Sequence, residues 1–141
     1  MSELFLIAQV AGRWVAIESA QVDSVVDIGD VVPVPRAGDR VRGLAALRSR
    51  VITVIDTHVA LGVPPRATSG RAVIAQMDGH HYAFLVDALE DVAPFERQPL
   101  ATGIADGRWS AASAGVVIRD DEPLMVLDLA QLLPAVCGAN A

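Results

Sequence analysis

The 141-residue sequence contains no lysine and only one cysteine, Cys137. A single cysteine excludes an internal disulfide. No stretch approaches the ~18 consecutive apolar residues of a membrane-spanning helix. The N-terminus also lacks the basic segment and apolar core of a secretion signal. The sequence therefore predicts a cytoplasmic protein that does not insert directly into a membrane.

Basic residues are outnumbered by acidic ones, and the formal net charge is −6. An acidic chain is a poor candidate for binding nucleic acid, because phosphate contacts need a basic surface. All eleven basic residues are arginines, and five of them lie within fifteen residues: Arg36, Arg40, Arg42, Arg48 and Arg50. Such a run is either a solvated loop or a local basic surface for another protein, and composition leaves both readings open.

Aromatic residues make up only 4% of the chain, whereas hydrophobic residues make up 52%. The core must therefore consist mainly of valine, isoleucine, leucine and alanine. The length suits one domain, or two small subdomains that share a core.

Short apolar runs separated by turns recur along the chain. The turn at Asp78-Gly79 favours a hairpin, because this pair suits a type I′ turn. Such spacing is typical of β-sandwiches and barrels. Two halves follow the same outline of hairpin, bent strand, loop, hairpin and short helix, without a residue-level repeat. Strands are expected over 4–10, 13–17, 22–28, 41–47, 51–56, 72–77, 80–86 and 88–95, with two more in 116–129 and helical turns in 57–62 and 127–136.

Asp56 and His58 are the first candidates for chemistry, since residues two apart share one face of a strand and could begin a metal site. No other histidine or cysteine has a supporting spacing, and zinc usually needs three or four protein ligands. Asp56 could instead cap the helical turn that follows it. No Gly-x-Ser-x-Gly elbow or phosphate loop is present. A small metal-dependent or hydrolytic enzyme built on Asp56 and His58 remains the alternative to a binding protein.

The region around Arg48 carries a family resemblance. The chemotaxis coupling (CheW-like) domain family has the pattern G-x-x-N-L-R-G-x-V-I-P-V-I-D-L-R-x-x-L-G. This sequence has Gly43, Ala46-Leu47-Arg48-Ser49, Val51-Ile52-Thr53-Val54-Ile55-Asp56 and Leu61-Gly62. The segments VDSVV, VPVP, FLVDALEDV and LMVLDLAQLL follow in the family's order. The chain thus resembles this family over about residues 4–133.

The resemblance implies a mainly β fold with two intertwined five-stranded SH3-like barrels. They would form a single domain over 1–141, with an approximate subdomain junction near 63–71. It also implies a non-catalytic adaptor of two-component signalling that needs no cofactor and no metal. Its partners would be the signalling tip of a chemoreceptor (a methyl-accepting chemotaxis protein) and the regulatory domain of a CheA-type histidine kinase, which has the same fold. No kinase or receiver segment is attached, which favours a stand-alone adaptor.

Matching positions predict a partner-binding set of eight residues. For the valines the alternative is core packing, and for Gly43 it is a backbone conformation that only glycine tolerates. Ala46, Ser49, Thr53 and His58 depart from the family pattern, so a divergent adaptor in a non-motility pathway is a further alternative. Ser49 would strain its turn if the family's glycine has a positive φ. The predicted set is Gly43, Leu47, Arg48, Ser49, Val22, Val25, Asp87 and Val92.

Overall fold

The computed structural model describes residues 3–10, 12–29, 31–33, 41–47, 49–61, 70–77, 79–99 and 113–132. These residues contain ten strands and three short helical segments, in agreement with the predicted pattern. The strands are β1 (Glu3–Val10), β2 (Arg13–Glu18), β3 (Ser24–Asp27), β4 (Val41–Leu47), β5 (Arg50–Ile55), β6 (Arg71–Met77), β7 (His80–Leu85), β8 (Ala88–Phe95), β9 (Ser113–Arg119) and β10 (Glu122–Leu127). The helical segments are α1 (Thr57–Ala60), η1 (Ser19–Gln21) and η2 (Leu129–Leu132).

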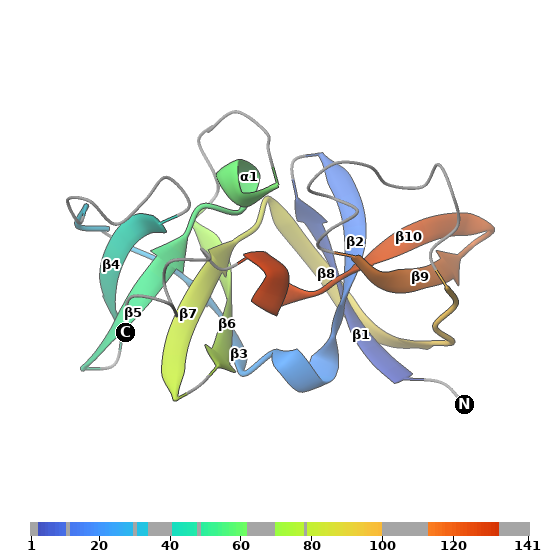
Figure 1. Cartoon of the computed structure of the whole chain (residues 1–141), viewed down its shortest axis with the longest axis horizontal. Coiled ribbons are helices and arrows are strands. Elements are labelled where there is room, and N and C mark those ends of the chain that lie inside the picture. The colour runs from blue at the N-terminus through green and yellow to red at the C-terminus, as the bar shows by residue number, and fades with distance from the viewer. Residues whose placement is uncertain are drawn as a thin grey trace.

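The strands form two five-stranded sheets that lie side by side (Figure 1). Sheet A has the order β8-β1-β2-β10-β9, and sheet B has the order β3-β6-β7-β5-β4. The mainly β fold with two subdomains is therefore confirmed. No helix in the described ranges is long and apolar enough to cross a membrane.

The two sheets repeat one plan and exchange strands. Each contains two antiparallel hairpins joined by a parallel pair, β2 with β10 in sheet A and β7 with β5 in sheet B. In each sheet the fifth strand pairs with the outer strand of one hairpin: β8 with β1 of the β1–β2 hairpin, and β3 with β6 of the β6–β7 hairpin. The first half of the chain gives β1 and β2 to sheet A and β3, β4 and β5 to sheet B. The second half gives β6 and β7 to sheet B and β8, β9 and β10 to sheet A. This exchange gives the intertwining that the resemblance implied.

The chain crosses between the sheets after β2 and again after β7. The segment 63–71, where the sequence predicts a subdomain junction, lies mostly outside the described residues. Strands β5 and β6 flank that segment, and both belong to sheet B.

Side chains from both sheets form the largest apolar cluster. It joins Val15 and Ile17 of β2 to Phe84 of β7, with Leu129 and Leu132 of η2 packed among them. Smaller clusters lie within sheet B and within sheet A. Because burial of each large aliphatic or aromatic side chain stabilises a fold by about 1.5–3 kcal/mol, the shared cluster holds the two sheets together.

Within the described ranges, one isolated β-bridge joins the two edges of each sheet. Beyond β3, Val32 exchanges two backbone hydrogen bonds with Leu44 of β4, at 2.8 and 2.9 Å. Beyond β8, Gln98 exchanges two with Val116 of β9, at 2.7 and 2.8 Å. The strand at one edge of each sheet therefore continues into a segment that pairs with the opposite edge.

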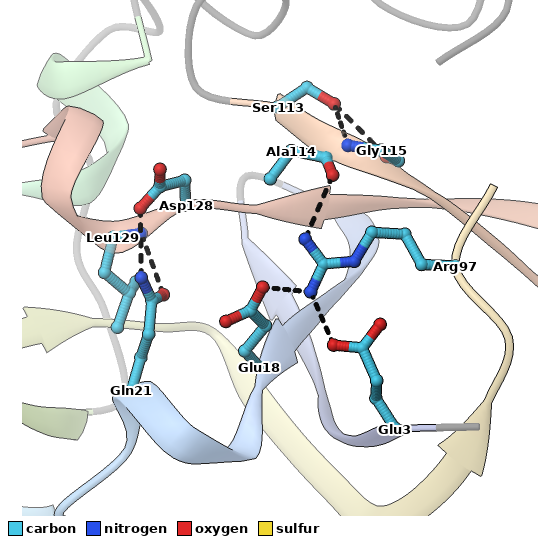
Figure 2. Close-up of polar contacts among 9 residues, drawn as sticks. All are labelled: Glu3, Glu18, Gln21, Arg97, Ser113, Ala114, Gly115, Asp128 and Leu129. Atoms are coloured by element: carbon cyan, nitrogen blue, oxygen red, sulfur yellow. Dashed lines mark hydrogen bonds and ion pairs between the residues drawn. The ribbon is translucent and has the colours of Figure 1, made fainter. Parts of the chain in front are cut away.

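Arg97 fastens the bridge of sheet A to the two central strands beside it (Figure 2). Its guanidinium donates to the carboxylates of Glu18 on β2 and Glu3 on β1, the latter at 2.9 Å, and to the Ala114 carbonyl at 3.3 Å. The hydrogen bond to Glu18 is the main cause of the raised pKa of Arg97, against an opposing effect of burial. The guanidinium also lies 5.6 Å from the centre of the Phe5 ring.

Each of the four hairpins turns through two residues, and the second of these has a positive φ. That residue is Gly12 in β1–β2, Ser49 in β4–β5, Gly79 in β6–β7 and Asp121 in β9–β10, with φ between 66° and 79°. The positive φ of Gly79 agrees with the predicted Asp-Gly turn. Ser49 is at the strained position that its departure from the family pattern indicated.

Ser49→Gly should raise the free energy of unfolding by about 0.5–1 kcal/mol. The left-handed conformation costs a residue with a side chain about 1–2 kcal/mol, which exceeds the extra entropy that glycine loses on folding. Urea denaturation checks this value, with Gly79→Ser as the matched control that should lower stability by about 1 kcal/mol. A Ser49→Gly variant less stable than the parent would contradict the strain.

Candidate functional site: the β4–β5 hairpin and strand β3

The β4–β5 hairpin carries four of the eight predicted partner-binding residues. Leu47 ends β4 and pairs with Arg50 at the start of β5, so only two residues form the turn. Ser49 is exposed at this turn. Arg48, the residue of the family pattern, lies outside the described residues and its role stays a prediction.

A cavity of about 160 Å³ lies between this hairpin and β3. Its apolar lining consists of Leu47, Ile52 of β5 and Ile74 of β6. Asp23 and Ser24 of the β3 segment and Arg50 and His81 contribute polar groups. Two segments far apart in sequence therefore meet around one opening.

Arg50 and His81 form a pair at this cavity. The Arg50 Nη1 atom lies 2.7 Å from Nε2 of His81, a residue of the neighbouring strand β7. The sequence left Arg50 either as solvated charge or as part of a basic surface for another protein, and the residue is exposed. Arg50 and His81 are 31 positions apart, so no local sequence pattern predicts their contact. The alternation of side chains along a strand predicts only that His80 and His81 point to opposite faces of the sheet.

The two valines near β3 have different environments. Val22 is half-buried and packs against the shared core, which supports the core-packing alternative for this residue. Val25 is 41% exposed on β3, which pairs with β6. Of the two, Val25 is the one accessible to a partner.

Gly43 is buried in β4, where it has a backbone role. Its φ is +152°, and a Cβ atom there would lie 2.3 Å from the Val32 carbonyl oxygen. The close approach of Val32 and the unusual φ both require glycine. The structure thus supports the conformational alternative for Gly43.

Asp87 and Val92 lie away from the hairpin. Asp87 follows β7 at the crossover between the sheets, where its Oδ1 atom lies 3.1 Å from Nε2 of the fully buried His58. The other oxygen of Asp87 accepts a hydrogen bond of 3.0 Å from the Gly12 amide in the β1–β2 turn. Val92 is 51% exposed on β8 of sheet A. The structure therefore gives Asp87 a role in joining the sheets.

Asp56 and His58 are each held by other parts of the chain. Asp56 is the N-cap of α1 and accepts from the Val59 amide at 3.2 Å, and its second oxygen lies 3.3 Å from Arg42. The capping alternative for Asp56 is thus confirmed. Among the described residues, no group of three or more histidine, cysteine, aspartate or glutamate side chains could hold a metal ion.

The other departures from the family pattern lie on the same two strands. Ala46 is exposed on β4, and Thr53 is half-buried on β5 between Leu44 and Tyr82. Neither one lines the cavity.

Three comparisons place the chain among known proteins. The CheW-like domain family matches residues 4–137. The chemotaxis protein CheW of Thermotoga maritima is 26% identical over 127 residues, which cover 89% of this chain and 83% of that protein. The crystal structure of the scaffolding protein TtCheW from Thermoanaerobacter tengcongensis has a TM-score of 0.82 at 22% identity, covering 96% of this chain and 90% of that one. Because the family match spans nearly the whole sequence, this chain belongs to the CheW-like domain family.

Proposed function

We propose that this chain is a signalling adaptor that couples the cytoplasmic tip of a chemoreceptor to the regulatory domain of a CheA-type histidine kinase. The observation that carries the proposal is the CheW-like domain match over residues 4–137. The adaptor acts by position: it holds the kinase against the receptor, so that receptor movement shifts the kinase between active and inactive states. It works in the cytoplasm, where the receptor tip and the regulatory domain of the kinase are both located.

The β4–β5 hairpin is the proposed centre of partner binding, with Arg48 as its main contact and Leu47, Ser49 and Val25 beside it. Several features support this choice. The hairpin has an exposed turn, and β3, which carries the exposed Val25, borders the same cavity. Arginine is enriched in protein interfaces because its planar guanidinium pairs with carboxylates while its stem covers apolar surface.

The adaptor itself performs no catalysis in this proposal. Asp56 is occupied by the helix cap and by Arg42, and His58 is enclosed against Asp87, so neither side chain is presented to a substrate. Elemental analysis of the purified protein tests this point. Stoichiometric zinc, manganese or iron would favour the enzyme alternative.

Arg48→Glu should weaken binding to both partners at least tenfold, because the substitution reverses the charge at the proposed contact. Isothermal titration of the variant against a receptor-tip fragment and against the kinase regulatory domain measures both affinities. Arg13→Glu makes the same charge change at an exposed position of sheet A and serves as the control. Unchanged affinity of Arg48→Glu for both partners would remove Arg48 from the site.

A further inference from the structure

Because the two sheets repeat one plan, the position of the cavity beside the β4–β5 hairpin has an equivalent position in sheet A. His81 is the second residue of β7 and pairs with Gln76, whereas Trp14 is the second residue of β2 and pairs with Gln9. Leu47 likewise ends β4 as Arg119 ends β9. The repeat therefore aligns His81 with Trp14 and Leu47 with Arg119.

In sheet A, side chains of the protein itself bridge this position. The Arg119 guanidinium lies 5.5 Å from the centre of the Trp14 ring, within the range of a cation–π contact. Its Nη1 atom also donates a 2.7 Å hydrogen bond to Glu90 of β8. An aromatic ring, a cation and a carboxylate thus link three strands.

In sheet B, the smaller side chains of His81 and Leu47 occupy the positions of Trp14 and Arg119. Imidazole stands where sheet A has indole, and the Leu47 side chain stands where sheet A has a guanidinium. Asp23, at the start of the β3 segment, is exposed and forms no ion pair with any described residue. The cavity of about 160 Å³ occupies the place that side chains bridge in sheet A.

The size and lining of the cavity define what fits in it. A cavity of ~150 Å³ lined by aliphatic side chains accommodates a benzene molecule. The cavity beside the hairpin is of similar volume but is partly open to solvent. Among the described residues Leu47, Ile52 and Ile74 form its apolar part, and its other lining residues are polar. One phenylalanine or leucine side chain therefore matches the available space.

The charge at the rim adds a second element of recognition. Among the described residues Arg50 contacts only the His81 ring, at 2.7 Å, and an imidazole carries no negative charge in either protonation state. Among the described residues no carboxylate forms an ion pair with Arg50, although Asp23 lines the same cavity. A carboxylate of a partner would complement it as a charge-assisted hydrogen bond.

We infer that this cavity receives one large apolar side chain of a protein partner, with an acidic residue next to it that pairs with Arg50. The partner's ring or branched chain takes the place that Trp14 holds in sheet A. This inference rests on the proposed function for the identity of the partner, but the cavity and its chemistry are defined by this chain alone.

His81→Trp should lower the affinity for the kinase regulatory domain or the receptor-tip fragment at least tenfold, because indole would fill the cavity as in sheet A. Ser24→Leu, on another wall, should have the same effect, and Arg50→Glu should weaken binding to a similar extent. Ala130→Trp adds an indole at an exposed position of η2 and should leave the affinity unchanged. Circular dichroism of each variant establishes that it folds. Folded His81→Trp and Ser24→Leu variants that bind as the parent does would overturn the inference.

A second measurement separates this inference from the proposed function. Titration of N-acetyl-Glu-Phe-amide into the 15N-labelled protein should shift the amide signals of Leu47, Ile52 and Ile74, and the shifts should vanish in His81→Trp. N-acetyl-Lys-Phe-amide should bind more weakly because its charge repels Arg50. If the acidic dipeptide binds while neither partner fragment binds, the proposed function fails and the cavity assignment stands. If the acidic dipeptide shifts none of these signals, or shifts them equally in His81→Trp, the cavity assignment fails.

Discussion

Gly43→Ala should destabilise the protein by about 3 kcal/mol or more, because the added methyl group would clash with backbone at a strained φ. A Cβ atom at this position would lie 2.3 Å from the Val32 carbonyl oxygen and 2.8 Å from Cγ1 of Val31. The first of these contacts is with backbone, which cannot rotate away. The φ of +152° is a further strain for any residue with a side chain.

The contact matters because Val32 joins the edges of sheet B. Its amide and carbonyl exchange hydrogen bonds with Leu44, next to Gly43 in β4. Relief of the clash would require the segment after β3 to move away, and both hydrogen bonds would then be lost. We therefore expect Gly43→Ala to weaken partner binding as well, through displacement of β3 from the hairpin.

Urea denaturation measures this effect, and two other glycines provide controls. Gly29→Ala should change stability little, because nothing lies within 4 Å of the added Cβ. Gly115→Ala should be clearly destabilising, because its Cβ would lie 2.8 Å from the Gln98 carbonyl oxygen at a φ of +129°. A Gly43→Ala variant within about 0.5 kcal/mol of the parent would show that the bridge adapts at little cost.

Asp87→Ala should destabilise the protein by about 2–3 kcal/mol, because two groups lose their partner at once. His58 is fully buried, and its Nε2 atom lies 3.1 Å from Asp87 Oδ1. The geometry of this contact does not meet the criteria of a hydrogen bond. Its energy therefore comes mainly from electrostatic attraction between the carboxylate and the imidazole, which is stronger in the protein interior than in water. The Gly12 amide would also lose the acceptor that ties the β1–β2 turn to the crossover.

A double-mutant cycle isolates the His58 part of this effect. The pair Asp87→Ala with His58→Leu should be less destabilised than the sum of the single variants, by about 1 kcal/mol, because leucine needs no polar partner. Asp91→Ala, an exposed aspartate on β8, should be nearly neutral and is the control. Strict additivity would indicate that Asp87 acts only through Gly12.

Local patterns predicted the strands and turns well, because alternation and turn chemistry act over a few residues. The hairpins around Gly12 and Gly79 and the cap formed by Asp56 are of this kind. The division of each half of the chain between the two sheets could not be predicted from pattern, because pairing between distant strands leaves no local periodicity. The resemblance to the family supplied the intertwining that the pattern could not.

The candidate site likewise has features that local sequence predicts and features that depend on contacts between distant residues. The motif identified the hairpin from Leu47 to Arg50, but it gave no indication of the cavity that β3, β6 and β7 complete around it. The Arg50–His81 pair is invisible in sequence for the same reason. The predicted set also combined different roles, because Gly43 and Val22 serve the fold whereas Val25 is exposed.

The proposed adaptor should join a receptor to a kinase in one complex. Size-exclusion chromatography of the purified chain with a receptor-tip fragment and a CheA-type kinase measures this assembly directly. We expect one ternary complex that contains all three proteins. When the chain is omitted, the receptor fragment and the kinase should form much less complex with each other. Two results would contradict the adaptor function: the chain elutes separately from both partners, or the receptor fragment and the kinase form as much complex without the chain as with it.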